Sequence, residues 1–148
     1  FLTGLVAFCF AHIAFIGAFI TKGIVWKRAG VAAVPMAIAL IVILRWLLPN
    51  VQQPIETIGV CVYATLITSM VLAAAGASEG PAGRILLSGA VIIYISDIFV
   101  SGWKYAGFSA DLGRFCYPLY YTACLLFAIS VFARRRMGDH HEQGPSGA

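Results

Sequence analysis

The sequence ILLSGAVIIYISDIFV, residues 85–100, decides the fold class of this chain. It holds one charged residue, Asp97, and is otherwise apolar, small, aromatic or hydroxyl-bearing. A strand of a membrane β-barrel has about ten residues of alternating polarity, so this run is too long and too uniform to be one. A helix that crosses the hydrocarbon layer needs roughly 20 apolar residues, and this run can extend to Ala106. We therefore expect a transmembrane helix here.

Four further apolar runs are long enough, or nearly so, to cross a bilayer. The connections between the runs are short, which makes consecutive helices antiparallel neighbours. Pro54 is expected to begin the helix that follows one of these connections. Gly76 is expected to end the same helix, because Pro is common at helix starts and Gly at helix ends. The sequence predicts an all-α, polytopic transmembrane helix bundle over residues 1–133. The four further runs cover residues 2–20, 31–48, 55–75 and 112–132.

The composition excludes an ordinary soluble domain. Of the 148 residues, 61% are hydrophobic and only 11% are charged, whereas soluble domains carry roughly 25% charged residues. The net charge is +4, but the basic residues lie between the apolar runs and in the tail. This placement fits loops that face anionic lipid headgroups, and we expect membrane lipids rather than nucleic acid as partners.

The loop charges predict an orientation in the membrane. The side that holds Lys22, Arg84 and Arg134 carries more Lys and Arg than the side that holds Lys104 and Arg114. By the positive-inside rule the first side is cytoplasmic, and we expect a bacterial inner membrane. Residues 134–148 are polar and are predicted to be a disordered cytoplasmic tail.

The sequence lacks the motifs of several enzyme classes. It has no Gly-rich phosphate loop, no nucleophile elbow around a serine and no HExxH pair. None of the four cysteines belongs to a CxxC pair or has a histidine at metal-ligand spacing. We expect these cysteines to be small buried hydrophobic residues, and we expect no metal and no cofactor. They are Cys9, Cys61, Cys116 and Cys124.

Two ionisable residues lie well inside the apolar runs and are candidates for a site. Asp97 costs about 2.5–3.5 kcal/mol to insert at a helix centre, and helical spacing places Tyr94 and Ser101 beside it. Alternatively, Asp97 has a structural role, in which its protonated carboxyl group is held by hydrogen bonds between helices. His12 lies in the middle of the first run, either as a structural neutral imidazole or as a proton carrier or hydrogen-bonding partner.

Three more polar residues are candidates for substrate contacts. Glu56 either pairs with Arg45 across the short turn between their helices or faces a polar cavity that opens outward. Tyr63 lies seven residues from Glu56, so the two share a helix face. Tyr121 lies deeper in the last run than Tyr117, and its hydroxyl group needs a partner there.

Four segments follow one another in the order Gly4-Leu5-Val6-Ala7-Phe8 with Ala11-His12, then Tyr63…Ile67…Met70, Gly89-Ala90…Ser96-Asp97, and Tyr120-Tyr121-Thr122-Ala123. In this order they resemble the YhhN (lysoplasmalogenase) family. The resemblance covers nearly the whole chain up to Phe132. It implies a bundle of eight helices, and because the chain begins at Phe1 inside an apolar run, we expect three helices to precede it. Two positions depart from the family pattern: Cys124 stands where Gln is usual, and Phe15 where Tyr is common.

The resemblance implies cleavage of the vinyl ether bond of lysoplasmalogens, which releases a fatty aldehyde. Protonation of carbon starts this reaction, and two carboxyl groups with separated pKa values suit it. We expect Asp97 to be one of them and an aspartate of a preceding helix to be the other, with His12 and Tyr121 orienting water or the ether oxygen. Tyr63, Tyr94 and Glu56 would contact the lysophospholipid.

Two other functions remain open at this point, as does the oligomeric state. Asp97 and His12 could be relay groups of a transporter or proton-coupled carrier. The chain could also be a non-catalytic membrane scaffold, in which case an apolar residue at position 97 would be nearly harmless.

Overall fold

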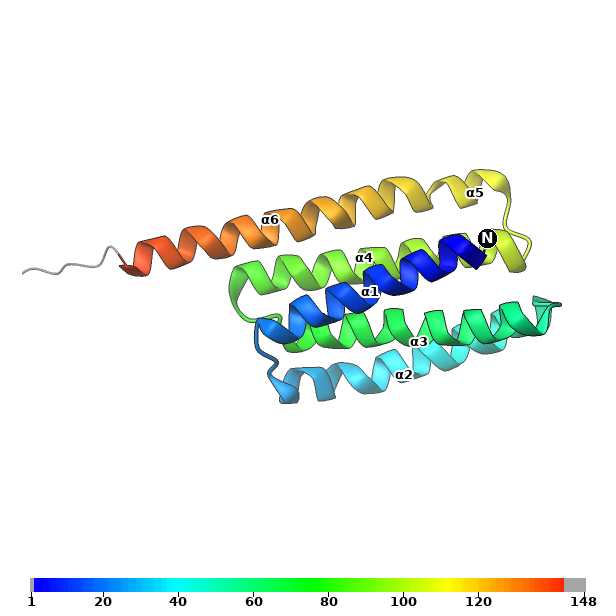
Figure 1. The fold of residues 1–148 in the computed structure, drawn as a ribbon, viewed down its shortest axis with the longest axis horizontal. Coiled ribbons are helices and arrows are strands. Elements are labelled where there is room, and N and C mark those ends of the chain that lie inside the picture. The colour runs from blue at the N-terminus through cyan, green and yellow to red at the C-terminus, as the bar shows by residue number, and fades with distance from the viewer. Residues whose placement is uncertain (1, 143–148) are drawn as a thin grey trace, which may run out of the picture.

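The computed structural model describes residues 2–142 of the chain, and the side-chain surroundings of residues 3–134. The described part is helical throughout apart from its connections, and five of its helices are long and apolar enough to cross a membrane (Figure 1). The predicted all-α bundle of five membrane-crossing helices is confirmed, and the chain is an integral membrane protein. These helices are α1 (Leu2–Thr21), α2 (Trp26–Leu47), α3 (Pro54–Gly76), α4 (Gly80–Tyr105) and α6 (Cys116–Glu142).

Most helix ends lie within a few residues of the predicted ends of the apolar runs. Helix α3 has Pro54 in its first turn, where the missing N–H costs nothing. Helix α2 begins at Trp26, five residues before the predicted start. Hydropathy places Lys27 and Arg28 outside the membrane. They are nevertheless good helix formers, so the helix extends to include them.

The sequence predicted one continuous helix from Leu112, but the last apolar run forms two. A short helix, α5 (Ala110–Arg114), comes first and ends at Phe115, and α6 begins at Cys116. Pro118 explains the break, because it has no N–H to donate to the carbonyl group of Arg114 and its ring would clash with that group.

The segment after Arg134 also differs from the prediction of disorder. Helix α6 continues through Glu142, so residues 134–142 are helical. Arg and Met favour helix, and a helix that leaves the membrane need not end at its surface. Residues 143–148 of the predicted tail lie outside the described residues.

Helices α4 and α6 pack closely through small residues. Ala90 and Ala123 are fully buried between them, and a Cβ atom on Gly89 would lie 2.8 Å from the ring of Phe127. The hydroxyl group of Ser96 donates a hydrogen bond of 2.8 Å to the carbonyl oxygen of Cys116. Close approach at small residues is the usual means by which membrane helices associate.

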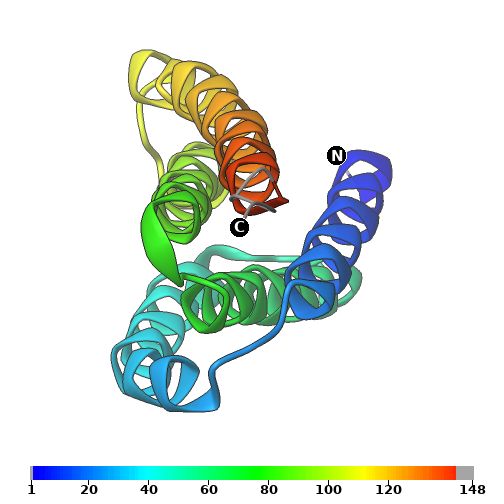
Figure 2. The ribbon, with the colours of Figure 1, turned by 90° about the vertical axis from the view of Figure 1, so that its left-hand side faces the viewer.

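Helix α1 is held in a different way. It packs along α3 and stands apart from α4 and α6 in the end-on view (Figure 2). Aromatic side chains bridge this separation: Phe8 contacts Tyr120, and Phe15 and Phe19 contact Phe127, with ring centroids 5.0–5.9 Å apart.

The hydrophobic core lies in one half of the bundle. Phe19, Met70, Ala74 and Leu86 belong to it, and all four lie toward the connection between α1 and α2. The opposite half holds the N-terminal part of α1, the end of α2, the start of α3 and the end of α4 (Figure 1). Side chains fill this second half less completely, as the cavity described below shows.

The close approach of α4 and α6 predicts opposite effects for two glycine substitutions. Gly89→Ala should destabilise the fold by about 1–3 kcal/mol, since overpacking forces the neighbours apart. Gly17→Ala, on α1, is the matched control because a Cβ atom there meets nothing within 4 Å. It should be neutral or stabilising by up to about 1 kcal/mol, the helix-propensity gain. Unfolding in detergent measures both, and equal effects would contradict the packing described.

Candidate functional site

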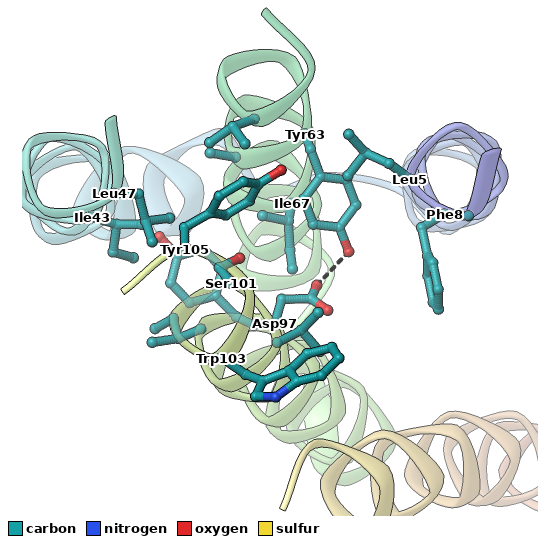
Figure 3. Close-up of a pocket in the computed structure, with 16 residues that line it drawn as sticks. Leu5, Phe8, Ile43, Leu47, Tyr63, Ile67, Asp97, Ser101, Trp103 and Tyr105 are labelled. Carbon is teal, nitrogen blue, oxygen red and sulfur yellow. Dashed lines mark hydrogen bonds between the residues drawn. The ribbon is translucent and has the colours of Figure 1, made fainter. Parts of the chain in front are cut away.

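A cavity of about 340 Å³ lies in the less filled half of the bundle, between α1, α2, α3 and α4 (Figure 3). Most of its wall is aliphatic or aromatic, with a few polar groups that converge on it. Such a wall suits a mostly apolar ligand that is oriented by a small number of polar contacts. Its polar and aromatic-polar lining residues are Tyr63, Tyr94, Asp97, Ser101, Trp103 and Tyr105.

Asp97 is the one carboxylic acid among the described residues that line the cavity. It projects from α4 toward α3, where the hydroxyl group of Tyr63 donates a hydrogen bond of 2.6 Å to its Oδ2 atom (Figure 3). An ionised carboxyl in such apolar surroundings is costly unless it is hydrogen-bonded or paired. Tyr63 supplies one such bond, and the other carboxyl oxygen, Oδ1, is left for a proton or a ligand.

His12 approaches the same carboxyl group from α1. Its side chain is 1% exposed, and its Nδ1 atom lies 2.7 Å from the carbonyl oxygen of Phe8. A carbonyl oxygen only accepts hydrogen bonds, so Nδ1 carries the proton and Nε2 of the neutral ring is left with a free lone pair. That Nε2 atom lies 3.8 Å from Oδ2 of Asp97 and has no hydrogen-bond partner among the described residues.

Ring contacts hold the imidazole in this position. The ring of His12 meets the ring of Tyr63 edge-on, with 5.3 Å between centroids, and that of Phe15 with 6.4 Å. Three helices thus bring a base, a phenol and a carboxyl group together within a few ångströms. This arrangement can store a proton on Asp97 and accept a proton on His12, next to a cavity with an apolar wall.

The structure brings four of the six predicted site residues together. Asp97, His12 and Tyr63 form the cluster described above, and Tyr94 lines the cavity with its hydroxyl group 3.5 Å from that of Thr68. Tyr121 does not join them: it is 68% exposed on the outer face of α6.

Glu56 lies at the rim of the cavity rather than in its wall. Its carboxylate is beside the hydroxyl group of Tyr105. The alternative ion pair with Arg45 is not among the pairs of charged side chains seen in the described residues, which include Arg28 with Glu79 and Arg114 with Asp111.

Sequence reasoning missed two residues near the cluster. Tyr105 lines the cavity and lies on the same face of α4 as Asp97 and Ser101, eight and four residues after them, so helical periodicity alone could have found it. Tyr120 packs its ring against Phe8 and is the tyrosine of α6 that faces the bundle. No signal in the sequence separates it from its neighbour Tyr121.

No group of three metal-ligating side chains comes together in the part of the chain that the structure describes. The four cysteines are all free thiols there, and Cys116 is buried while the others are partly buried.

The model of one protein family, the YhhN family, matches residues 1–131. Neither a curated protein nor a solved structure matches the chain significantly. The matched range includes all five helices as far as the membrane-crossing part of α6, and with them every residue of the cluster around Asp97.

The hydrogen bond between Tyr63 and Asp97 predicts a stability difference between two tyrosine substitutions. Tyr63→Phe removes the donor to a buried carboxyl group and should lower the free energy of unfolding by about 1–3 kcal/mol. Tyr117→Phe is the matched control, since Tyr117 is 64% exposed and should change stability by less than about 0.5 kcal/mol. Unfolding of both variants in the same detergent checks this, and a neutral Tyr63→Phe would contradict the bond.

Proposed function

The chain belongs to the YhhN family, and from this membership and the geometry around Asp97 we propose that it is a membrane hydrolase. Its proposed reaction is cleavage of the vinyl ether bond of lysoplasmalogen-like lysophospholipids by carboxyl acid/base catalysis. The observation that carries the proposal is a carboxyl group at an apolar cavity, hydrogen-bonded by Tyr63 and lying 3.8 Å from an unpartnered imidazole nitrogen.

The reaction needs an acid that can protonate carbon. Transfer of a proton from Asp97 to the alkene carbon remote from the ether oxygen breaks the double bond and leaves an oxocarbenium ion. Water then adds to the carbon attached to oxygen and gives a hemiacetal, whose C–O bond breaks to yield a fatty aldehyde and the free glycerol hydroxyl group. One water molecule is consumed, and the proton returns to the site.

Each member of the cluster has a role in this sequence. A carboxyl group in an apolar wall tends to stay protonated because its charged form is poorly solvated, so Asp97 suits the acid role. Once it has given up its proton, the bond from Tyr63 stabilises the carboxylate, and the negative charge stabilises the oxocarbenium ion. Nε2 of His12 suits the acceptance of a proton from the attacking water.

The position of the cavity fits an amphiphile in a membrane. The cavity extends from the middle of α4, at Tyr94 and Asp97, to the end of this helix at Tyr105. A lysophospholipid with its headgroup at the bilayer surface would place its ether bond below the headgroup, at the depth of Asp97. We propose that this surface is the outer one of a bacterial inner membrane, with the C-terminus in the cytoplasm.

A proton-coupled carrier is the second candidate function, and the closeness of His12 and Asp97 favours it. Two buried ionisable groups on different helices can pass a proton between them during a transport cycle. A carrier would take up a solute into proteoliposomes in response to a proton gradient and would release no product.

Replacement of Asp97 by Asn tests the proposed reaction, because it keeps the shape of the side chain and removes the acidic proton. Wild type in detergent micelles should release fatty aldehyde from a lysoplasmalogen but not from the acyl lysophospholipid of the same chain length. Asp97→Asn should release aldehyde at least about 100-fold more slowly, because general acid catalysis accelerates reactions by about 100-fold or more.

Asp111→Asn is the control for this substitution. Its carboxylate is 85% exposed on α5 and pairs with Arg114, so the variant should keep full activity. Full activity of Asp97→Asn would refute the role of Asp97. If well-folded wild type releases no aldehyde, the hydrolase proposal fails, and uptake into proteoliposomes becomes the next assay.

A further inference from the structure

The rim of the cavity carries a carboxylate that the proposed chemistry does not use. Glu56 lies in the first turn of α3, one helical turn before Val60, and Val60, Ala64 and Ile67 all line the cavity. Residues at these spacings share one face of a helix. Glu56 is therefore on the cavity face of α3, at the end where α3 begins and α4 ends (Figure 1).

Tyr105 faces Glu56 from the other side of the rim. It lines the cavity at the last turn of α4, and its hydroxyl group lies beside the carboxylate of Glu56. Glu56 is half-buried and is not among the acidic residues that form ion pairs within the described residues. A carboxylate and a phenol at the mouth of an apolar cavity form an environment that attracts a cation with N–H or N–CH₃ groups.

We propose that Glu56 and Tyr105 form a headgroup subsite that binds the ammonium group of a zwitterionic lysophospholipid. This inference rests on the proposed function, since it takes the reacting bond of the lipid to lie at Asp97. It assigns to Glu56 a role in substrate selection and none in the chemical step.

The dimensions of the cavity and of the lipid agree. Asp97 and Tyr105 are eight residues apart on one helix, which corresponds to about 12 Å at a rise of about 1.5 Å per residue. In an ethanolamine or choline lysoplasmalogen, about eleven bonds join the protonated alkene carbon to the nitrogen, and an extended chain advances about 1.2 Å per bond, or about 13 Å. A lipid with its vinyl ether at Asp97 therefore reaches Glu56 with its nitrogen.

The other groups along this path fit the intervening part of the lipid. Ser101 lies one helical turn beyond Asp97 and lines the cavity, at the height of the glycerol hydroxyl group. The Nζ atom of Lys104 lies 5.8 Å from the centre of the Tyr105 ring, so a positive charge also lies near the rim.

The test compares two vinyl-ether substrates that differ only in the ammonium group: an ethanolamine lysoplasmalogen and the 1-alkenyl glycerophosphate that lacks the ethanolamine. Glu56→Gln should lower kcat/KM for the first by about tenfold, as expected for the loss of a charge-assisted hydrogen bond, and leave the second nearly unchanged. Glu56→Lys should reverse the preference in favour of the phosphate lipid. Glu79→Gln, a carboxylate at the other end of the bundle paired with Arg28, should change neither.

Two results would overturn the subsite. An equal loss for both lipids in Glu56→Gln would mean a structural role, and no change in kcat/KM for either lipid would mean no contact with the headgroup. Binding of the non-hydrolysable 1-alkyl ether analogues, with and without ethanolamine, separates this inference from the proposed reaction. Headgroup preference in binding that depends on Glu56, without any aldehyde release, would support the subsite and refute the hydrolase.

Discussion

The poor solvation of a carboxyl group in an apolar, water-poor interior is the constraint on which this structure depends. Asp97 lies in the middle of a bundle that has hydrocarbon outside it, and a charge there is tolerated only with partners close by. Tyr63 on α3 and His12 on α1 approach that carboxyl group, so groups from three helices meet at one side chain. The group that costs most to bury is also the one that can do chemistry.

One half of the bundle is well packed and stabilises the fold, and the other half holds the candidate site. In one half, Gly89, Ala90 and Ala123 let α4 and α6 approach closely, and Phe15, Phe19 and Phe127 fill the space beside α1. In the other half, α1, α2, α3 and α4 surround a cavity of about 340 Å³ with Asp97 in its wall. A well-packed end thus holds rigid the helices that carry the open end, as a preorganised site requires.

Hydropathy and cost of burial identified the helices and the centre of the site from the sequence. Asp97 and His12 were selected because few residues are as unfavourable in a membrane helix, and Tyr63 because of its position on the face of Glu56.

The break before α6 was predictable from Pro118 but was missed, since an apolar run says nothing of local backbone continuity. The choice of Tyr121 over Tyr120 was unsupported for a physical reason: residues that face lipid are as apolar as residues that face the bundle, so α6 has no amphipathic pattern to set its rotation. The pairing of Glu56 with Tyr105 rather than Arg45 depends on the packing of α3 against α4, which loop length does not reveal.

The most direct test of the account is a structure of the protein in lipid with a bound, non-hydrolysable 1-alkyl ether lysophospholipid. The account predicts the ether in the cavity, with the carbon that would receive the proton about 3–3.5 Å from a carboxyl oxygen of Asp97, the separation of a reactive pair. A lipid bound elsewhere would contradict it, as would an ether displaced from Asp97 by more than one helical turn, about 5.4 Å.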